Sequence, residues 1–213
     1  MQFHCAAILF DLDGVLVDSA ECVERTWRAW AAQHALDAET VIAAAHGRRT
    51  IETLQLVAPE LATDAEAHAL ESSVATIAEG VHEIDGAREF VAGLPADRWA
   101  VVTSGIRAVA EFRIRLVGLP SPKVLICADD ISRGKPDPEG YLKAAKGLGF
   151  SSADCLVIED APAGIDAARA AGMRVVAIAA TYPKAQLRHA DAIVDRLSDV
   201  HVAFRGGALS VRG

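Results

Sequence analysis

Long apolar runs, paired cysteines and an excess of positive charge are all missing from this 213-residue sequence. No stretch approaches the ~18 apolar residues that a membrane-spanning helix needs, and the first residues lack the charged start and apolar run of a signal peptide. Both absences predict a cytoplasmic protein that contacts no membrane. The formal charge of −8 provides no basic surface, so we expect no nucleic-acid partner.

Cysteine and low-complexity sequence are equally scarce. The four cysteines are scattered through apolar stretches without a C-x-x-C pair, which indicates buried thiols in a reducing compartment. The hydrophobic content of 52% is ample for one large domain, or for a core with an inserted unit, and we expect a monomer or a weak dimer. Only the glycine-containing tail, residues 205–213, is expected to fray.

Short apolar runs alternate with helical patterns over most of the chain. The runs predict buried strands at residues 5–10, 99–103, 124–127, 155–158, 175–178 and 192–194. Helices are predicted at 106–117, 138–148 and 162–171, the last two opening with proline at the first helical position. Alternating strands and helices imply right-handed crossovers, so the fold class is α/β, with a Rossmann-like parallel sheet covered on both faces.

Residues 17–85 break this alternation, because they contain no convincing strand. A capping box of Thr63 and Glu66 precedes one stripe of apolar residues at helical spacing: Ala67, Leu70, Val74, Ile77 and Val81. A second stripe comprises Val23, Trp27, Trp30 and Ala31. We predict an all-helical unit of residues 17–85, with its tryptophans in the helix packing, inserted into a core of residues 1–16 and 86–213.

Polar side chains follow four of the predicted strands. They are Asp11 and Asp13, Thr103 and Ser104, Lys135, and Glu159 and Asp160. In an open parallel sheet, ligands bind outside the carboxyl ends of the strands, so these side chains are candidates for one site. They supply carboxylates for a hard cation, a spare carboxyl group for acid–base chemistry, hydroxyl donors, and one ammonium for phosphate.

The acidic residues also have ordinary structural explanations. Asp11 and Asp13 could stand in a solvated turn, and Asp160 could cap the helix that starts at Pro162. Two acidic clusters at different strand ends favour a metal site, because buried carboxylates repel each other unless a divalent cation lies among them. Mg²⁺ fits best, since it prefers oxygen ligands and commonly binds through one or two carboxylates and a substrate phosphate.

Two further segments are suited to holding phosphate. Lys135 lies in the sequence Arg-Gly-Lys-Pro-Asp-Pro, whose glycine and prolines restrict the backbone and hold the ammonium at the crevice. Thr103, Ser104 and Gly105 end a strand with a hydroxyl group and with backbone amides that can form an anion nest. The same residues could also be an ordinary surface lysine and the start of a helix.

Four segments, in this order, resemble the motifs of the haloacid dehalogenase-like superfamily. They are Phe-Asp11-Leu-Asp13-Gly-Val-Leu-Val-Asp18-Ser19, Val-Val-Thr103-Ser104-Gly105, Arg-Gly-Lys135-Pro-Asp-Pro and Val-Ile-Glu159-Asp160-Ala-Pro-Ala-Gly164. The match covers residues 6–178, and the helical insertion resembles the C1 cap of that family. The segment His46-Gly47-Arg48-Arg49-Thr50 resembles a cap loop of family phosphatases that act on glycerol phosphate and on hexose or deoxyhexose phosphates.

The resemblance implies a Mg²⁺-dependent phosphatase that acts on a small phosphorylated sugar or polyol. Asp11 would be the nucleophile that forms an aspartyl-phosphate, and Asp13 the acid and base for the leaving group and the water. Thr103 and Lys135 complete the implied catalytic set, and Ser104 joins them in phosphate binding. The implied metal ligands are Asp11, Asp13, Glu159 and Asp160. The implied substrate-binding residues of the cap loop are Gly47, Arg48, Arg49 and Thr50.

Other activities of the family fit these residues less well. Phosphonoacetaldehyde hydrolases use a cap lysine, and this chain has no lysine before Lys123. Dehalogenases lack the second aspartate that Asp13 supplies. A phosphomutase resembling β-phosphoglucomutase is the nearest rival, but Val23 stands where those mutases carry a histidine. Phosphoglycolate hydrolysis and a catalytically silent binding protein of the same fold also stay open.

Overall fold

Six parallel strands form the central sheet of the structure, a computed structural model that describes residues 1–213 except for the side chain of Arg205. In spatial order they are β6 (Leu125–Ile126), β5 (Trp99–Val102), β2 (Ala7–Phe10), β7 (Cys155–Glu159), β8 (Arg174–Ile178) and β9 (Ala192–Val194). Each lies where the sequence predicts a strand. The α/β class with a Rossmann-like parallel sheet is therefore confirmed.

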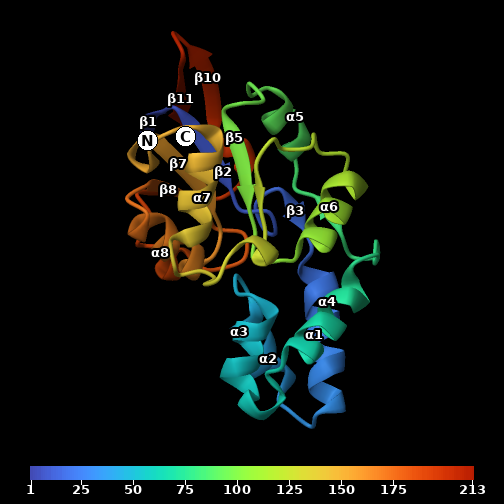
Figure 1. The fold of residues 1–213 in the computed structure, drawn as a ribbon. Helices are drawn as coiled ribbons and strands as arrows, with labels where there is room; N and C mark the ends of the chain where they lie inside the picture. Colours follow the sequence, from blue (N-terminus) through green and yellow to red (C-terminus); the bar gives the residue numbers. More distant parts are fainter.

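Helices cover both faces of this sheet. Figure 1 shows α5 (Ala87–Ala92) and α6 (Arg107–Leu116) on one side, and α7 (Glu139–Leu148) and α8 (Pro162–Ala170) on the other. Successive residues of β2 divide between the two sides: Ile8 and Phe10 belong to the cluster that includes α5 and α6, and Leu9 to the cluster that includes α7 and α8. Because neither side meets water, the strand is apolar at every position.

The three predicted core helices match α6, α7 and α8 to within one residue, whereas α5 was not predicted. Pro162 is the first residue of α8, as predicted, whereas Pro138 precedes α7 as its N-terminal cap instead of opening it. Among the described residues, no helix is long and apolar enough to cross a membrane. Short 3₁₀ helices fill several connections: Pro59–Leu61, Ala128–Asp130, Ser152–Asp154, Lys184–Gln186 and Leu197–Asp199.

Four helices between β3 (Val17–Asp18) and β4 (His82–Glu83) form a separate group beyond one end of the sheet (Figure 1). They are α1 (Ala20–Gln33), α2 (Ala38–Ala45), α3 (Thr50–Val57) and α4 (Asp64–Val74). Trp27 and Trp30 pack edge to face, with ring centroids 5.6 Å apart, inside the hydrophobic cluster of these helices, as predicted. We call residues 17–85 the cap; treating them as a separate unit stays a prediction.

Three details of the cap differ from the prediction. β3 and β4 pair as two-residue antiparallel strands, which are too short to leave a periodic pattern in the sequence. The predicted helix through Val81 is too long, because α4 ends at Val74. Ile77 and Val81 lie beyond this helix and pack against the main core. Thr63 caps α4 by accepting the backbone N–H of Glu66, but the Glu66 carboxylate accepts the indole N–H of Trp30 instead of completing the capping box.

The two ends of the chain form a second sheet, which has three antiparallel strands. Its order is β1 (Gln2–Cys5), β11 (Ala208–Arg212) and β10 (His201–Arg205). The expectation that residues 205–213 fray is wrong, because Leu209 and Val211 alternate onto the covered face and are 0% exposed. The predicted first strand accordingly divides at Ala6, so that β1 joins this sheet and β2 the central one.

All four cysteines are buried and unpaired, which confirms the prediction: Cys5, Cys22, Cys127 and Cys155. Burial raises the pKa of Cys5 to about 11. It raises the pKa values of Cys127 and Cys155 to about 12. These three thiols therefore stay protonated at neutral pH and act as small apolar side chains.

Candidate active site

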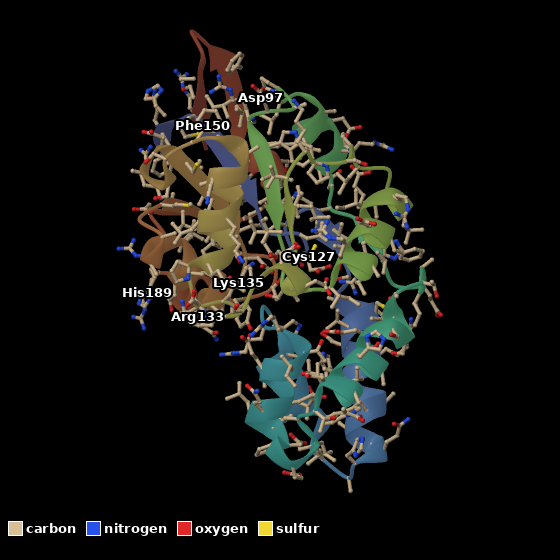
Figure 2. The ribbon with its side chains drawn as sticks, viewed as in Figure 1. Asp97, Cys127, Arg133, Lys135, Phe150 and His189 are labelled. Carbon is tan, nitrogen blue, oxygen red and sulfur yellow. The ribbon has the colours of Figure 1, made fainter. Side chains whose placement is uncertain are left out.

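The carboxyl ends of β2, β5 and β7 meet at the end of the sheet that faces the cap. β2 lies between the other two, since Phe10 pairs with Val101 of β5 and with Ile158 of β7. The residues just after these strands are consequently neighbours: Asp11, Thr103 and Asp160. Figure 2 shows Lys135 at this same end of the sheet, next to the cap. The structure thus gathers polar residues that are up to 149 positions apart in the chain, Asp11 and Asp160 being the extremes.

Lys135 joins two carboxylates at this end of the sheet. Its Nζ donates to Asp11 Oδ1 at 2.5 Å and to Glu159 Oε1 at 2.6 Å, and its side chain is 6% exposed. Burial alone lowers the pKa of Lys135, but the two carboxylates outweigh burial and raise that pKa well above its ordinary value. The ammonium is therefore charged at every working pH and held in one place.

Glu159 uses both of its carboxylate oxygens within the protein. Oε1 accepts from Lys135 and, at 3.0 Å, from the hydroxyl of Tyr141. Oε2 accepts the backbone N–H groups of Asp160 at 2.8 Å and Ala161 at 2.9 Å. A carboxylate has about four acceptor directions, and these four donors occupy them. Glu159 thereby orients Lys135 and the turn after β7, and it has little capacity left to bind a metal.

The acidic residues of the site nevertheless suit a divalent cation. Asp11, Glu159 and Asp160 offer oxygen atoms within 4.8 Å of one another, and all three residues are buried. Burial, followed by repulsion from neighbouring carboxylates, raises the pKa of Asp11 to about 7 and that of Asp160 well above its usual range. One ammonium does not balance three carboxylates. With Glu159 engaged elsewhere, Asp11 and Asp160 are the side chains best placed to hold a hard cation such as Mg²⁺.

Gly14 lets Asp160 come close to the first motif. The backbone of Gly14 has φ +84°, and a Cβ built on it would lie 2.0 Å from Asp160 Oδ2. A side chain at this position would therefore displace the carboxylate. Thr181, just beyond β8, also donates its hydroxyl to Asp160 Oδ2. Thr181 was not among the predicted site residues, although it follows a predicted strand as the others do.

Asp13 has partners of its own. Its Oδ1 accepts from Ser19 Oγ at 2.7 Å and from Arg113 Nη1 at 2.6 Å. The carboxylate of Asp13 lies outside the group of described carboxylates that could share a cation. Arg113 was also missed by the sequence analysis; its side chain is 6% exposed on the inward face of α6, next to Ile114. A charged residue in an apolar stripe predicts a buried partner, and that signal could have found it.

A model of the haloacid dehalogenase-like hydrolase family matches residues 5–172. The chain belongs to this family. The matched residues include the first motif, Lys135 and the acidic pair after β7, all of which contribute to the arrangement described above. The structure of this hydrolase therefore brings together candidate residues from the four sequence motifs.

Two curated relatives are similar to this hydrolase over most of its length. Hexitol phosphatase A of Escherichia coli (strain K12) is 41% identical over 207 residues, which cover 93% of this chain and 94% of the relative. Glycerol-1-phosphate phosphohydrolase 2 of Saccharomyces cerevisiae (strain ATCC 204508 / S288c) is 37% identical over 188 residues, which cover 83% of this chain and 75% of the relative. Among solved structures, a hydrolase from Pseudomonas syringae has a TM-score of 0.79 at 27% identity, covering 90% of this chain and 94% of that chain.

A cavity of about 460 Å³ opens between the core and the cap of the hydrolase. Its core side includes Asp11, Asp13, Thr103, Ser104, Arg113, Asp160 and Thr181. Its cap side includes Glu24, Trp27, His46, Gly47, Arg48, Thr50 and Glu71. Glu24 was not singled out by the sequence analysis, and nothing in the local pattern distinguishes it from the other glutamate of α1, Glu21. The volume suits a small metabolite.

The loop before α3 brings the cap onto the core. Ser104 Oγ donates to the carbonyl of Gly47 at 3.0 Å, and the rings of His46 and Tyr182 pack edge to face at 6.2 Å. Arg48 lines the cavity and donates to the carbonyl of Ala44 at 3.0 Å. Arg49, which the resemblance assigns to substrate, does not line the cavity; its guanidinium contacts the core loop that precedes Lys135.

Proposed function

We propose that this hydrolase is a Mg²⁺-dependent phosphatase that removes phosphate from a small sugar or polyol phosphate through an aspartyl-phosphate on Asp11. The observation that carries the proposal is the buried Lys135 ammonium, which joins Glu159 to Asp11. Asp11 and Asp160 line the cavity. The activities named for two relatives, a hexitol phosphatase and a glycerol-1-phosphate phosphohydrolase, support this substrate class.

In the proposed reaction, Asp11 attacks phosphorus in line and displaces the alcohol oxygen. Lys135, the Thr103 hydroxyl and the backbone amide of Ser104 hold the phosphate oxygens as charge moves across them. When bound by Asp11, Asp160 and the backbone carbonyl of Asp13, Mg²⁺ would offset the repulsion between a carboxylate and an anionic ester. Holding both anions near fixed positive charges is thus the main contribution of the protein.

Asp13 is the proposed acid and base of both steps. As a carboxylic acid it protonates the departing oxygen, and as a carboxylate it accepts a proton from the water that hydrolyses the aspartyl-phosphate. Ser19 and Arg113 hold one of its oxygens, and the residue lines the cavity, so its second oxygen can face the substrate. These contacts orient the carboxyl group without blocking it.

Substrate contacts on the cap side are proposed for Gly47, Arg48 and Thr50, all of which line the cavity. Glu24 and Glu71 line it as well. Carboxylates accept hydrogen bonds from sugar hydroxyls and repel anionic leaving groups. Their presence favours a neutral polyol or sugar over phosphoglycolate, whose leaving group carries a second negative charge.

A phosphate-release screen tests the proposal. Hexitol phosphates, glycerol phosphates, hexose and deoxyhexose phosphates and phosphoglycolate are compared with and without Mg²⁺, and Asp11→Asn serves as the inactive control. We expect release from polyol or sugar phosphates only with Mg²⁺ and only with Asp11 present. Isomerisation that requires a bisphosphate activator would instead support the phosphomutase, and unchanged turnover by Asp11→Asn would overturn the mechanism.

A further inference from the structure

Arg49 and Glu52, at the start of α3, connect the cap to the core loop that precedes Lys135. The Arg49 guanidinium donates to Glu52 Oε1 through Nε at 3.0 Å and through Nη2 at 2.6 Å. It also donates to the core carbonyls of Ile131 at 3.3 Å and Ser132 at 3.1 Å. Glu52 Oε1 in turn accepts the backbone N–H of Gly134 at 2.9 Å. We call Arg49 and Glu52 the latch pair.

The shape of the core loop fits the latch pair closely. Gly134 is buried, and its φ lies outside the positive range, so its backbone conformation does not require glycine. A Cβ built on Gly134 would instead lie 2.4 Å from Glu52 Oε2 and 2.9 Å from Arg49 Nε. The absence of a side chain at Gly134 therefore leaves room for the carboxylate of Glu52.

The contacts of the latch pair are partly shielded from water. The side chains of Arg49 and Glu52 are 15% and 23% exposed, and bonds between charged groups in such positions are stronger than exposed ion pairs. All three nitrogen atoms of the Arg49 guanidinium have acceptors within the protein. This residue is therefore committed to joining cap and core.

We propose that Arg49 and Glu52 are positioning residues, which dock the cap on the loop and thereby hold Lys135 in place for catalysis. Gly134 is the neighbour of Lys135 in the chain, so a displaced Gly134 moves the ammonium away from Asp11. Closure of the cap and placement of the phosphate-binding charge then depend on the same contacts. This inference rests on the proposed phosphatase function only for its kinetic consequence.

The kinetic test compares Glu52→Ala, Glu52→Gln and Gly134→Ala with wild type, using p-nitrophenyl phosphate and Mg²⁺. Glu39→Ala is the matched control, because Glu39 forms an ion pair with Arg28 at 2.6 Å that lies wholly within the cap. We expect Glu52→Ala and Gly134→Ala to lower kcat about tenfold, which matches the loss of a charge-assisted hydrogen bond, with a smaller change in KM. Glu52→Gln keeps an acceptor for the Gly134 N–H and should lose less.

Hydrogen exchange separates positioning from general destabilisation and needs no turnover. The amide of Gly134 should exchange faster in Glu52→Ala than in wild type, and at the wild-type rate in Glu39→Ala. The amides of the central sheet should stay protected in both variants, which distinguishes a local displacement from general unfolding. Wild-type kcat and wild-type Gly134 exchange in Glu52→Ala would overturn the proposal, as would equal kcat losses in Glu52→Ala and Glu39→Ala. A wild-type enzyme that releases no phosphate in the screen would refute the proposed function. The exchange comparison would still show whether the latch pair holds Gly134 in place.

Discussion

The core and cap sides of the cavity differ in how their polar groups are satisfied. On the core side, Asp11, Asp13 and Asp160 all have charged or hydroxyl partners at fixed positions. On the cap side, the described residues show no side-chain hydrogen bond for Glu24 or Trp27, although both line the cavity. The core side is thus organised before substrate arrives, whereas the cap side keeps a free acceptor and a free donor.

This difference matches the separate demands of chemistry and recognition. Stabilising a transition state requires charges that do not reorganise during the reaction. Recognising a hydroxylated leaving group requires polar atoms that water satisfies until substrate replaces it. Substitutions on the core side should therefore change kcat on every substrate, and those on the cap side should change discrimination among substrates.

The largest effect is expected on the core side, from Glu159→Gln. A glutamine has one oxygen, so it cannot accept both from Lys135 and from the backbone N–H groups that Glu159 Oε2 accepts, and it removes one of the two charges that hold Lys135. We therefore expect kcat to fall about 100-fold on all substrates, comparable to removing an oxyanion-stabilising donor. Steady-state kinetics on two unrelated phosphate esters would measure it. Tyr141→Phe, which removes one neutral hydrogen bond to Glu159, is the milder control. A loss confined to KM would contradict the orienting role.

A smaller and selective effect is expected on the cap side, from Glu24→Ala. Removing this acceptor should lower kcat/KM about tenfold on the preferred polyol phosphate, the cost of one hydrogen bond to a charged group, and leave p-nitrophenyl phosphate unaffected. Glu21→Ala, on the same helix but outside the cavity lining, is the control. Equal losses on both esters would show that Glu24 supports the fold rather than recognising the substrate.

The smallest effect concerns the pH dependence of stability. The pKa of Asp11 is raised to about 7 in the folded protein, against about 3.9 in an unfolded chain. Its contribution to metal-free stability is therefore full below about pH 4 and is lost as pH rises through 7. The rise in melting temperature that Mg²⁺ causes should be larger at pH 8 than at pH 5.5, and the difference between the two rises should be roughly 3 °C. Asp11→Asn should reduce this difference, and a larger Mg²⁺ effect at pH 5.5 than at pH 8 would contradict the expected direction.

The central sheet and its reactive end could be predicted from the sequence, because both follow from local patterns. An apolar run that ends abruptly in Asp11 or Glu159 identifies a buried strand and its polar terminus together. Parallel topology then brings such termini to one edge without further information. The order of the strands and the four motifs are sufficient for that step.

Contacts between distant elements could not be predicted in the same way. The sequence marks Arg49 as a cap-loop residue, but only the docking of cap on core decides whether it meets the substrate or the loop before Lys135. Arg113 likewise needs Asp13, which lies 100 positions away in the chain. The terminal sheet was missed because Leu209 and Val211 make too short an alternation to signal a strand that pairs with β1.

The burial of every cysteine makes this hydrolase convenient for labelling. All four native thiols are buried, so a maleimide dye should not react with them in the native state. Leu56 is 61% exposed and lies on α3, the helix that also carries Glu52 of the latch pair. A single Leu56→Cys substitution therefore provides one fluorophore on the cap, from which any opening and closing can be followed by fluorescence in real time.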